Sequence, residues 1–146
     1  MHLAQLNVAR LAHELDHPDL EPFTSALDAV NAVADESPGF VWRLQEGELG
    51  NATAIRPWGD DMIVNMSVWQ DLASLESYVY GPAHAAVLRQ RRMFFQRMER
   101  PSLVLWWVPE GHEPTLAEAR ERLDRLEATG PSAYAFTMRQ SFPPDV

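Results

Sequence analysis

Residues 67–98, SVWQDLASLESYVYGPAHAAVLRQRRMFFQRM, organise the rest of this chain. The stretch starts as the end of a strand, turns at Gln70 and Asp71 into a short helix, and is interrupted at Gly81-Pro82. Proline lacks an amide hydrogen but suits the first turn of a helix. We therefore expect a second, longer helix to begin at Pro82 and to run to Met98.

Two polar side chains fall on the apolar face of this longer helix. At about 100° per residue, His84 and Arg91 share that face with Val87, Leu88, Phe94, Phe95 and Met98. A buried arginine needs a partner, so these groups must meet a carboxylate, a carbonyl or a bound molecule. His84 lies in the first turn, where the helix dipole favours the neutral imidazole, which suits a metal ligand, an acceptor or a base. The alternative is a core histidine that bonds a backbone carbonyl.

Hydrophobic periodicity along the chain predicts the other elements. The predicted strands are 2–9, 40–45, 62–69 and 103–108, and the further helices are 19–36 and 115–128. A loop is expected over 46–61, and residues 134–139 are expected to add an edge strand. The order strand, helix, strand, strand, helix, strand (βαββαβ) is ferredoxin-like, an α+β fold whose antiparallel sheet carries helices on one face. We expect one domain, residues 1–146.

Alternation along the strands also defines the second face of the sheet. The side chains assigned to it include Gln5, Asn7, Asn65, Ser67 and Trp69. They are too mixed for a dry core and too apolar for open water, so we expect the sheet of a second copy to enclose them around a chamber. A homodimer follows from this prediction.

Composition narrows the classes of partner. The 146 residues are 46% hydrophobic and carry a net charge of −9, which argues against nucleic acid and anionic membranes as partners. No apolar run approaches membrane-spanning length, and we expect a cytoplasmic protein. The chain has no cysteine, which excludes disulfides, thiolate catalysis and iron–sulfur clusters.

One short motif resembles a zinc site. Residues 13–17, HELDH, match the H-E-x-x-H pattern, which requires both histidines on one face of a helix. Pro18 biases His17 away from helical geometry, and no clear third ligand follows. We expect an exposed loop here and no metal site.

Several segments in combination resemble a known family. They are LAQLNVARL, PGFVWR, MIVNMSVW, YGPAH, RRMFF, LVLWWVPEGHEPTLAEARERL and GPSAYAF. Together they resemble an uncharacterised bacterial family, domain of unknown function 3291. That family is grouped with the dimeric α/β-barrel proteins, which include cofactor-independent antibiotic-biosynthesis monooxygenases, haem-degrading monooxygenases and ligand binders. The resemblance implies this fold, whereas a fold alone leaves the activity open.

The haem-degrading proteins of that superfamily use an asparagine on the first strand, an aromatic residue on the central helix and a helix histidine as iron ligand. Asn7 resembles the first and His84 the last, and Tyr78 stands where a tryptophan is typical. The segment between Tyr78 and His84 is shorter than in those enzymes, and Gly81-Pro82 interrupts it.

Three functions stay open on these residues. The first is a cofactor-independent monooxygenase acting on an aromatic substrate, for which the resemblance implies Asn7, Trp69, Arg91 and Tyr80 as substrate-holding residues. In it, Asn7 and Arg91 would stabilise a phenolate and His84 would be the base. The second is a haem protein through His84, and the third is a non-catalytic binder of a small apolar or aromatic molecule. The expected pocket lies between sheet and central helix and includes Trp42, Asn65, Trp69, Tyr78 and Tyr80.

Overall fold

The computed structural model describes residues 1–45 and 51–144, so residues 46–50 of the predicted loop lie outside the described part. The strands are β1 His2–Leu11, β2 Phe40–Arg43, β3 Met62–Trp69, β4 Phe95–Gln96 and β5 Leu103–Val108. The helices are the 3-10 turn η1 Pro18–Leu20, α1 Glu21–Glu36, α2 Leu72–Val79, α3 Pro82–Arg89, α4 Arg91–Phe94 and α5 Leu116–Thr129. Among the described residues, no helix is both long and apolar enough to cross a membrane.

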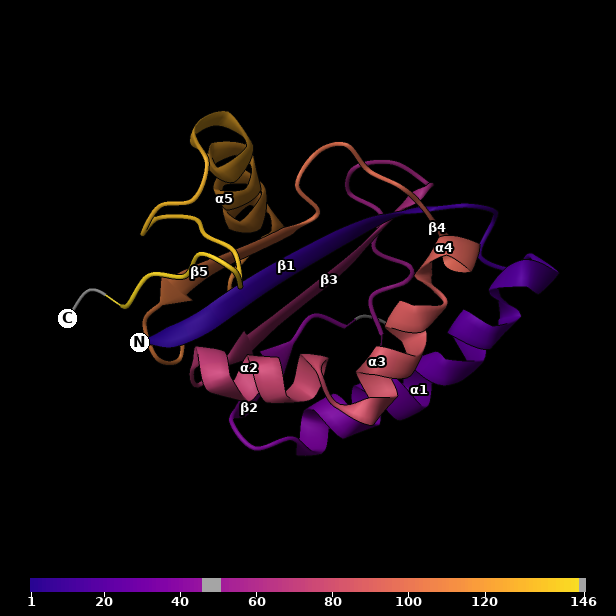
Figure 1. Cartoon of the computed structure of the whole chain (residues 1–146), viewed down its shortest axis with the longest axis horizontal. Coiled ribbons are helices and arrows are strands. Elements are labelled where there is room, and N and C mark those ends of the chain that lie inside the picture. Colours follow the sequence, from indigo (N-terminus) through magenta and orange to yellow (C-terminus); the bar gives the residue numbers. More distant parts are fainter. Residues whose placement is uncertain (46–50, 145–146) are drawn as a thin grey trace.

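The strands form one antiparallel sheet with the ferredoxin-like order (Figure 1). β3 lies between β2 and β1, and both β4 and β5 pair with the free edge of β1. β5 pairs with residues 2–7 of β1 and β4 with residues 10–11, so the two short strands share that edge end to end. The predicted fold class is confirmed.

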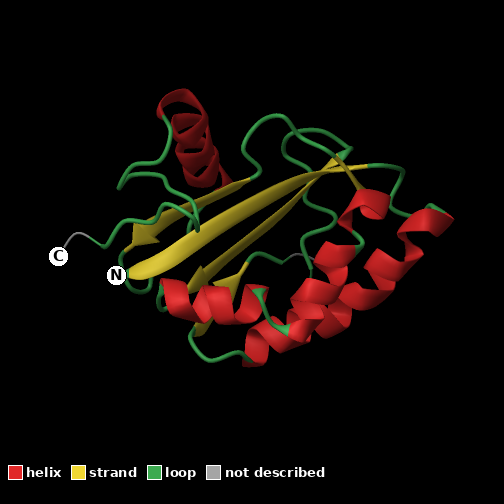
Figure 2. Ribbon diagram, viewed as in Figure 1, coloured by secondary structure: helices red, strands yellow, loops and turns green. Residues whose placement is uncertain are grey.

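Helices lie on both faces of this sheet (Figures 1 and 2). α1, α2 and α3 cover one face, and α5 alone covers the other. Thr115 caps α5 by accepting a hydrogen bond from the Glu118 amide at 3.1 Å. The predicted edge strand over 134–139 is reduced to a single bridge between Phe136 and Leu105.

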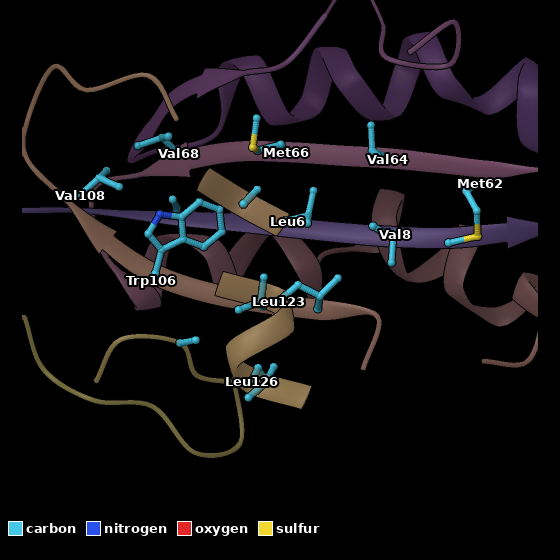
Figure 3. Packing of buried hydrophobic residues seen from close by; sticks show 14 residues of the cluster. Leu6, Val8, Met62, Val64, Met66, Val68, Trp106, Val108, Leu123 and Leu126 are labelled. Atoms are coloured by element: carbon cyan, nitrogen blue, oxygen red, sulfur yellow. The ribbon is translucent and has the colours of Figure 1, made fainter. Parts of the chain in front are cut away.

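The face beneath α5 is a dry apolar layer (Figure 3). Leu6 of β1, Met66 of β3 and Trp106 of β5 are each at most 1% exposed there. Leu123 and Leu126 of α5 pack against them. Ile55 and Trp58 of the connection before β3 also pack against this layer, so α5 and that connection together cover the face.

The polar strip of the sheet lies on the other face, beneath α1, α2 and α3. The expectation that it faces away from the helices, toward a second copy, is wrong. Alternation groups side chains on one face but carries no information on which face the helices cover. Here α5 packs on the apolar face, and α1–α3 pack on the mixed face.

The central helix is shorter than predicted. α3 ends at Arg89, and after the single turn of α4 the chain becomes extended at Phe95. Phe95 pairs with Leu11 and Gln96 with Arg10, so a strand replaces the predicted helical end. This pairing gives part of the β1 edge a hydrogen-bonding partner, which a helix at this position would not provide.

Candidate functional site

A cavity of about 430 Å³ lies between the polar strip of the sheet and the α1–α3 layer. Its floor comes from β1 and β3, and its walls come from α1, from the α2–α3 pair and from β2. The predicted site residues that line it are Asn7, Asn65, Trp69, Tyr78, Tyr80 and His84. Most of the remaining lining is apolar, from side chains such as Phe23, Leu27 and Val87. Cavities of this size with a few polar groups are typical of small-molecule sites.

Hydrogen bonds connect the polar groups of the floor. The Gln5 Nε2 amide donates to Asn65 Oδ1 and to Ser67 Oγ, each at 2.7 Å. The indole Nε1 of Trp69 also donates to Ser67 Oγ, at 2.9 Å. The bond from Gln5 engages the oxygen of Asn65 and leaves its amide nitrogen to donate toward the cavity.

Asn7 and Asn65 are directly opposite each other in the β1–β3 register. Both are exposed, although they lie in the middle of the two central strands and their chain neighbours are buried. Within the described part of the chain, the Asn7 side chain makes no hydrogen bond. Two amides therefore face the cavity side by side with unused hydrogen-bonding capacity.

Aromatic rings form a continuous row from the sheet to α3. Trp69 stacks on Tyr78 with ring centroids 5.2 Å apart, and Tyr78 meets His84 edge to face at 5.3 Å. The Tyr78 hydroxyl donates to the Val30 carbonyl of α1 at 3.3 Å. Tyr78 thus joins the two helical walls above the floor of the cavity.

Burial makes the Tyr78 phenol a weaker acid. It raises the pKa of the phenol to about 12. The positive charge of Arg43 acts in the opposite direction, and the negative charge of Asp35 adds to the rise. At neutral pH Tyr78 is therefore a hydrogen-bond donor and not a base.

Burial also lowers the pKa of His84, and interaction with the Val79 backbone opposes this shift in part. The Nδ1 atom of His84 is buried and has no hydrogen-bond partner of good geometry in the described residues. The imidazole is therefore neutral near pH 7. This agrees with the expected protonation state, but the cause is burial in the cavity wall.

Two predicted site residues lie outside the cavity. Arg91 belongs to α4, where its exposed side chain donates from Nη1 to the Leu88 carbonyl at 2.9 Å. Trp42 is partly buried and packs against the apolar layer on the opposite face of the sheet. The expected placement of both is wrong, because α3 ends before Arg91 and because a β-bulge follows Phe40.

The bulge brings Arg43 to the cavity instead. Phe40 pairs with Trp69, whereas Trp42 pairs with Val68 and Arg43 with Ser67, so strict alternation fails in β2. Arg43 lines the cavity with a side chain that is 14% exposed, and its Nε donates to Asp35 Oδ1 at 2.7 Å. Sequence periodicity has no signal for one extra residue in a short strand.

Further polar residues of the wall were also missed. Asn31 comes from α1, and Asn51 and Thr53 come from the connection that precedes β3. The side-chain oxygen Oδ1 of Asn51 accepts hydrogen bonds from the backbone amide of Thr53 at 3.0 Å and from its hydroxyl at 2.7 Å. Outside regular elements, no periodic pattern marks such residues as lining a site.

Comparisons with known proteins agree with this architecture. A family described as "Domain of unknown function (DUF3291)" matches residues 2–146. No curated protein matches the chain. Solved structures with the same fold include SnoaB, a cofactor-independent oxygenase from Streptomyces nogalater, which is 17% identical with a TM-score of 0.52. That alignment covers 80% of this chain and 98% of the other.

Two further structures have similar scores. A putative antibiotic biosynthesis monooxygenase from Chloroflexus aurantiacus is 14% identical, with a TM-score of 0.50 and coverage of 77% of this chain and 98% of the other. A protein of unknown function from Nitrosomonas europaea is 13% identical, with a TM-score of 0.52 and coverage of 78% and 95%. At these identities the likeness establishes the fold alone.

Proposed function

We propose that this chain, which belongs to the DUF3291 family of unknown function, binds a small aromatic molecule in its cavity and oxidises it as a cofactor-independent monooxygenase. The observation that carries the proposal is the pair Asn7 and Asn65, two exposed amides side by side in the floor of a cavity whose lining is mostly apolar. An apolar wall favours a flat hydrophobic ligand, and the paired amides suit its hydroxyl or carbonyl oxygen.

The residues around the amides fit proton removal from a phenol. His84 is neutral and lines the same cavity, so it is the candidate base. Asn7 and Asn65 would donate hydrogen bonds to the phenolate oxygen, the role expected of Asn7 together with Arg91. A phenolate conjugated with an activated CH2 group is electron-rich enough to react with O2 directly.

The electrons of the reaction come from the substrate. The CH2 group becomes C=O, one oxygen atom of O2 enters the product, and the other leaves as water with the two hydrogens. This balance requires no external reductant. The description of SnoaB as a cofactor-independent oxygenase supports the reaction class for a chain of this fold.

A haem held by His84 fits the described residues less well. The neutral imidazole suits an iron ligand, but its ring stands edge-on against Tyr78 and its Nδ1 is enclosed. Addition of hemin gives a direct test of this second candidate. A shifted Soret band that disappears in His84→Ala would favour the haem protein over the oxygenase.

The test of the oxygenase uses a panel of one- to three-ring phenols that carry an activated CH2 group, with tryptophan fluorescence for binding and an oxygen electrode for turnover. Trp69 lines the cavity, so a bound ring should quench its emission. We expect Asn7→Ala and Asn65→Ala each to weaken binding about 3- to 10-fold, the worth of one hydrogen bond. His84→Gln should lower oxygen uptake far more than it lowers binding.

The exposed Arg92 on α4 provides the control, because it does not line the cavity. Arg92→Ala should change neither binding nor oxygen uptake. Saturable binding without oxygen uptake across the panel would favour the non-catalytic binder. No saturable quenching by any member would contradict the aromatic ligand itself.

A further inference from the structure

A cluster of metal-binding side chains lies in the connection between β1 and α1. It contains His13 and His17 of the HELDH motif together with Asp19. The motif is not helical, as expected, and His17 caps the 3-10 turn η1. The third group was missed because Asp19 follows the motif immediately, at a spacing that no helical zinc pattern contains.

The distances within the cluster are close to those around a tetrahedral metal ion. His13 Nε2 lies 3.4 Å and His17 Nδ1 3.9 Å from Asp19 Oδ2. All three ligand atoms lie within 4.8 Å of one another. With metal–ligand bonds of about 2.0–2.1 Å, tetrahedral ligand atoms lie roughly 3.3–3.4 Å apart. Small side-chain rotations would therefore close the cluster around an ion.

Two features of the histidines bear on this closure. Their rings stack in parallel with centroids 4.0 Å apart, so they must tilt for both nitrogens to point at one ion. His17 Nδ1 also accepts the Asp19 backbone amide at 3.0 Å, and a metal would take over that lone pair. The free energy lost with one helix cap is small beside the free energy of zinc binding in protein sites.

We propose that His13, His17 and Asp19 bind one Zn²⁺ ion, with solvent in the fourth position. Two imidazoles and one carboxylate suit zinc better than the hard cations Mg²⁺ and Ca²⁺, which prefer oxygen ligands alone. His13 also lines an open surface hollow, which gives the ion a path to the site. The ion would join the end of β1 to the start of α1, the helix that forms one wall of the cavity.

The experiment measures zinc affinity on the tag-free full chain by competition with a chromogenic chelator, with ZnCl2 alone as the probe. We expect one equivalent to bind, and His13→Gln and Asp19→Asn to weaken it about tenfold or more. His112→Gln is the matched control, because His112 also pairs with a carboxylate, at 2.7 Å from Glu118 Oε1. It should leave the affinity unchanged.

A second readout reports on the site itself. When zinc binds, the Asp19 amide loses its acceptor, so its hydrogen exchange should become faster while the melting temperature of the chain rises. Absence of binding below about 0.1 mM zinc would overturn the proposal. Equal zinc affinity in the wild type and His13→Gln would also overturn it, and circular dichroism verifies that each variant is folded.

Discussion

His84 connects the stability of the protein to pH. Burial lowers its pKa below the ordinary 6.5, so the unfolded chain binds this proton more readily than the folded chain does. The free energy of unfolding is therefore unaffected by this group above pH 6.5, where His84 is neutral in both states. It decreases as pH falls below 6.5, because the unfolded chain then takes up a proton that the folded chain does not. We expect urea unfolding of His84→Gln to depend less on pH in this range than that of the wild type. Equal pH dependence would contradict the lowered pKa.

Tyr78 should give a separate signal at alkaline pH. Its pKa of about 12 lies above the ordinary value of 10, so the folded chain keeps this proton while the unfolded chain loses it. Stability should therefore fall as pH rises from 10 to 12. Ultraviolet titration of the phenols should show a step near 12 that disappears in Tyr78→Phe. The step should persist in Tyr80→Phe, which removes a tyrosine that is 71% exposed.

Alanine substitutions at two glycines distinguish the cost of backbone strain from the cost of a steric clash between elements. Gly39, between α1 and β2, has φ +85°, and an added Cβ would lie 2.5 Å from the Ser74 Cβ of α2. Gly111 has φ +83° with nothing within 4 Å of an added Cβ. Gly111→Ala should cost about 1 kcal/mol from the backbone alone. Gly39→Ala should cost clearly more in chemical denaturation, and equal costs would show that α2 gives way freely.

α5 should contribute strongly to stability, because it covers the apolar face of the sheet. Leu126 is 4% exposed in that layer, and its truncation leaves a cavity. We expect Leu126→Ala to lower the free energy of unfolding by about 2–5 kcal/mol, measured in urea. Glu121→Ala, on the exposed side of the same helix, should change it by less than about 0.5 kcal/mol. Similar small effects from both would contradict the packing.

The homodimer stays a prediction, but the reason first given for it, a mixed sheet face that a second copy would cover, no longer applies. The polar strip is covered by α1–α3 of the same chain, and the apolar face is covered by α5 together with Ile55 and Trp58. We expect light scattering to give twice the mass of one chain. Because residues of one chain line the cavity, its affinity for a phenol should stay constant on dilution below the dimer dissociation constant. A loss of affinity on dilution would mean that a second copy completes the site.

Local sequence patterns were sufficient to predict the elements and their order. They also predicted that Asn7, Asn65 and Trp69 share one face of the sheet. Helical spacing and the cap at Thr115 each involve only a few neighbouring residues, so they can be recognised from the sequence alone. The ferredoxin-like sheet follows from the order of those elements.

Contacts between distant segments decided the remaining features. The central helix ended at Arg89, which left Arg91 in solvent, and pairing of Phe95 with Leu11 replaced the predicted helical end with a strand. A bulge exchanged Trp42 for Arg43 at the cavity, and the covering by α5 selected which sheet face became the floor. Periodicity identifies residues that share a side of an element, but the partner of that side depends on free energies gained only when the whole chain packs.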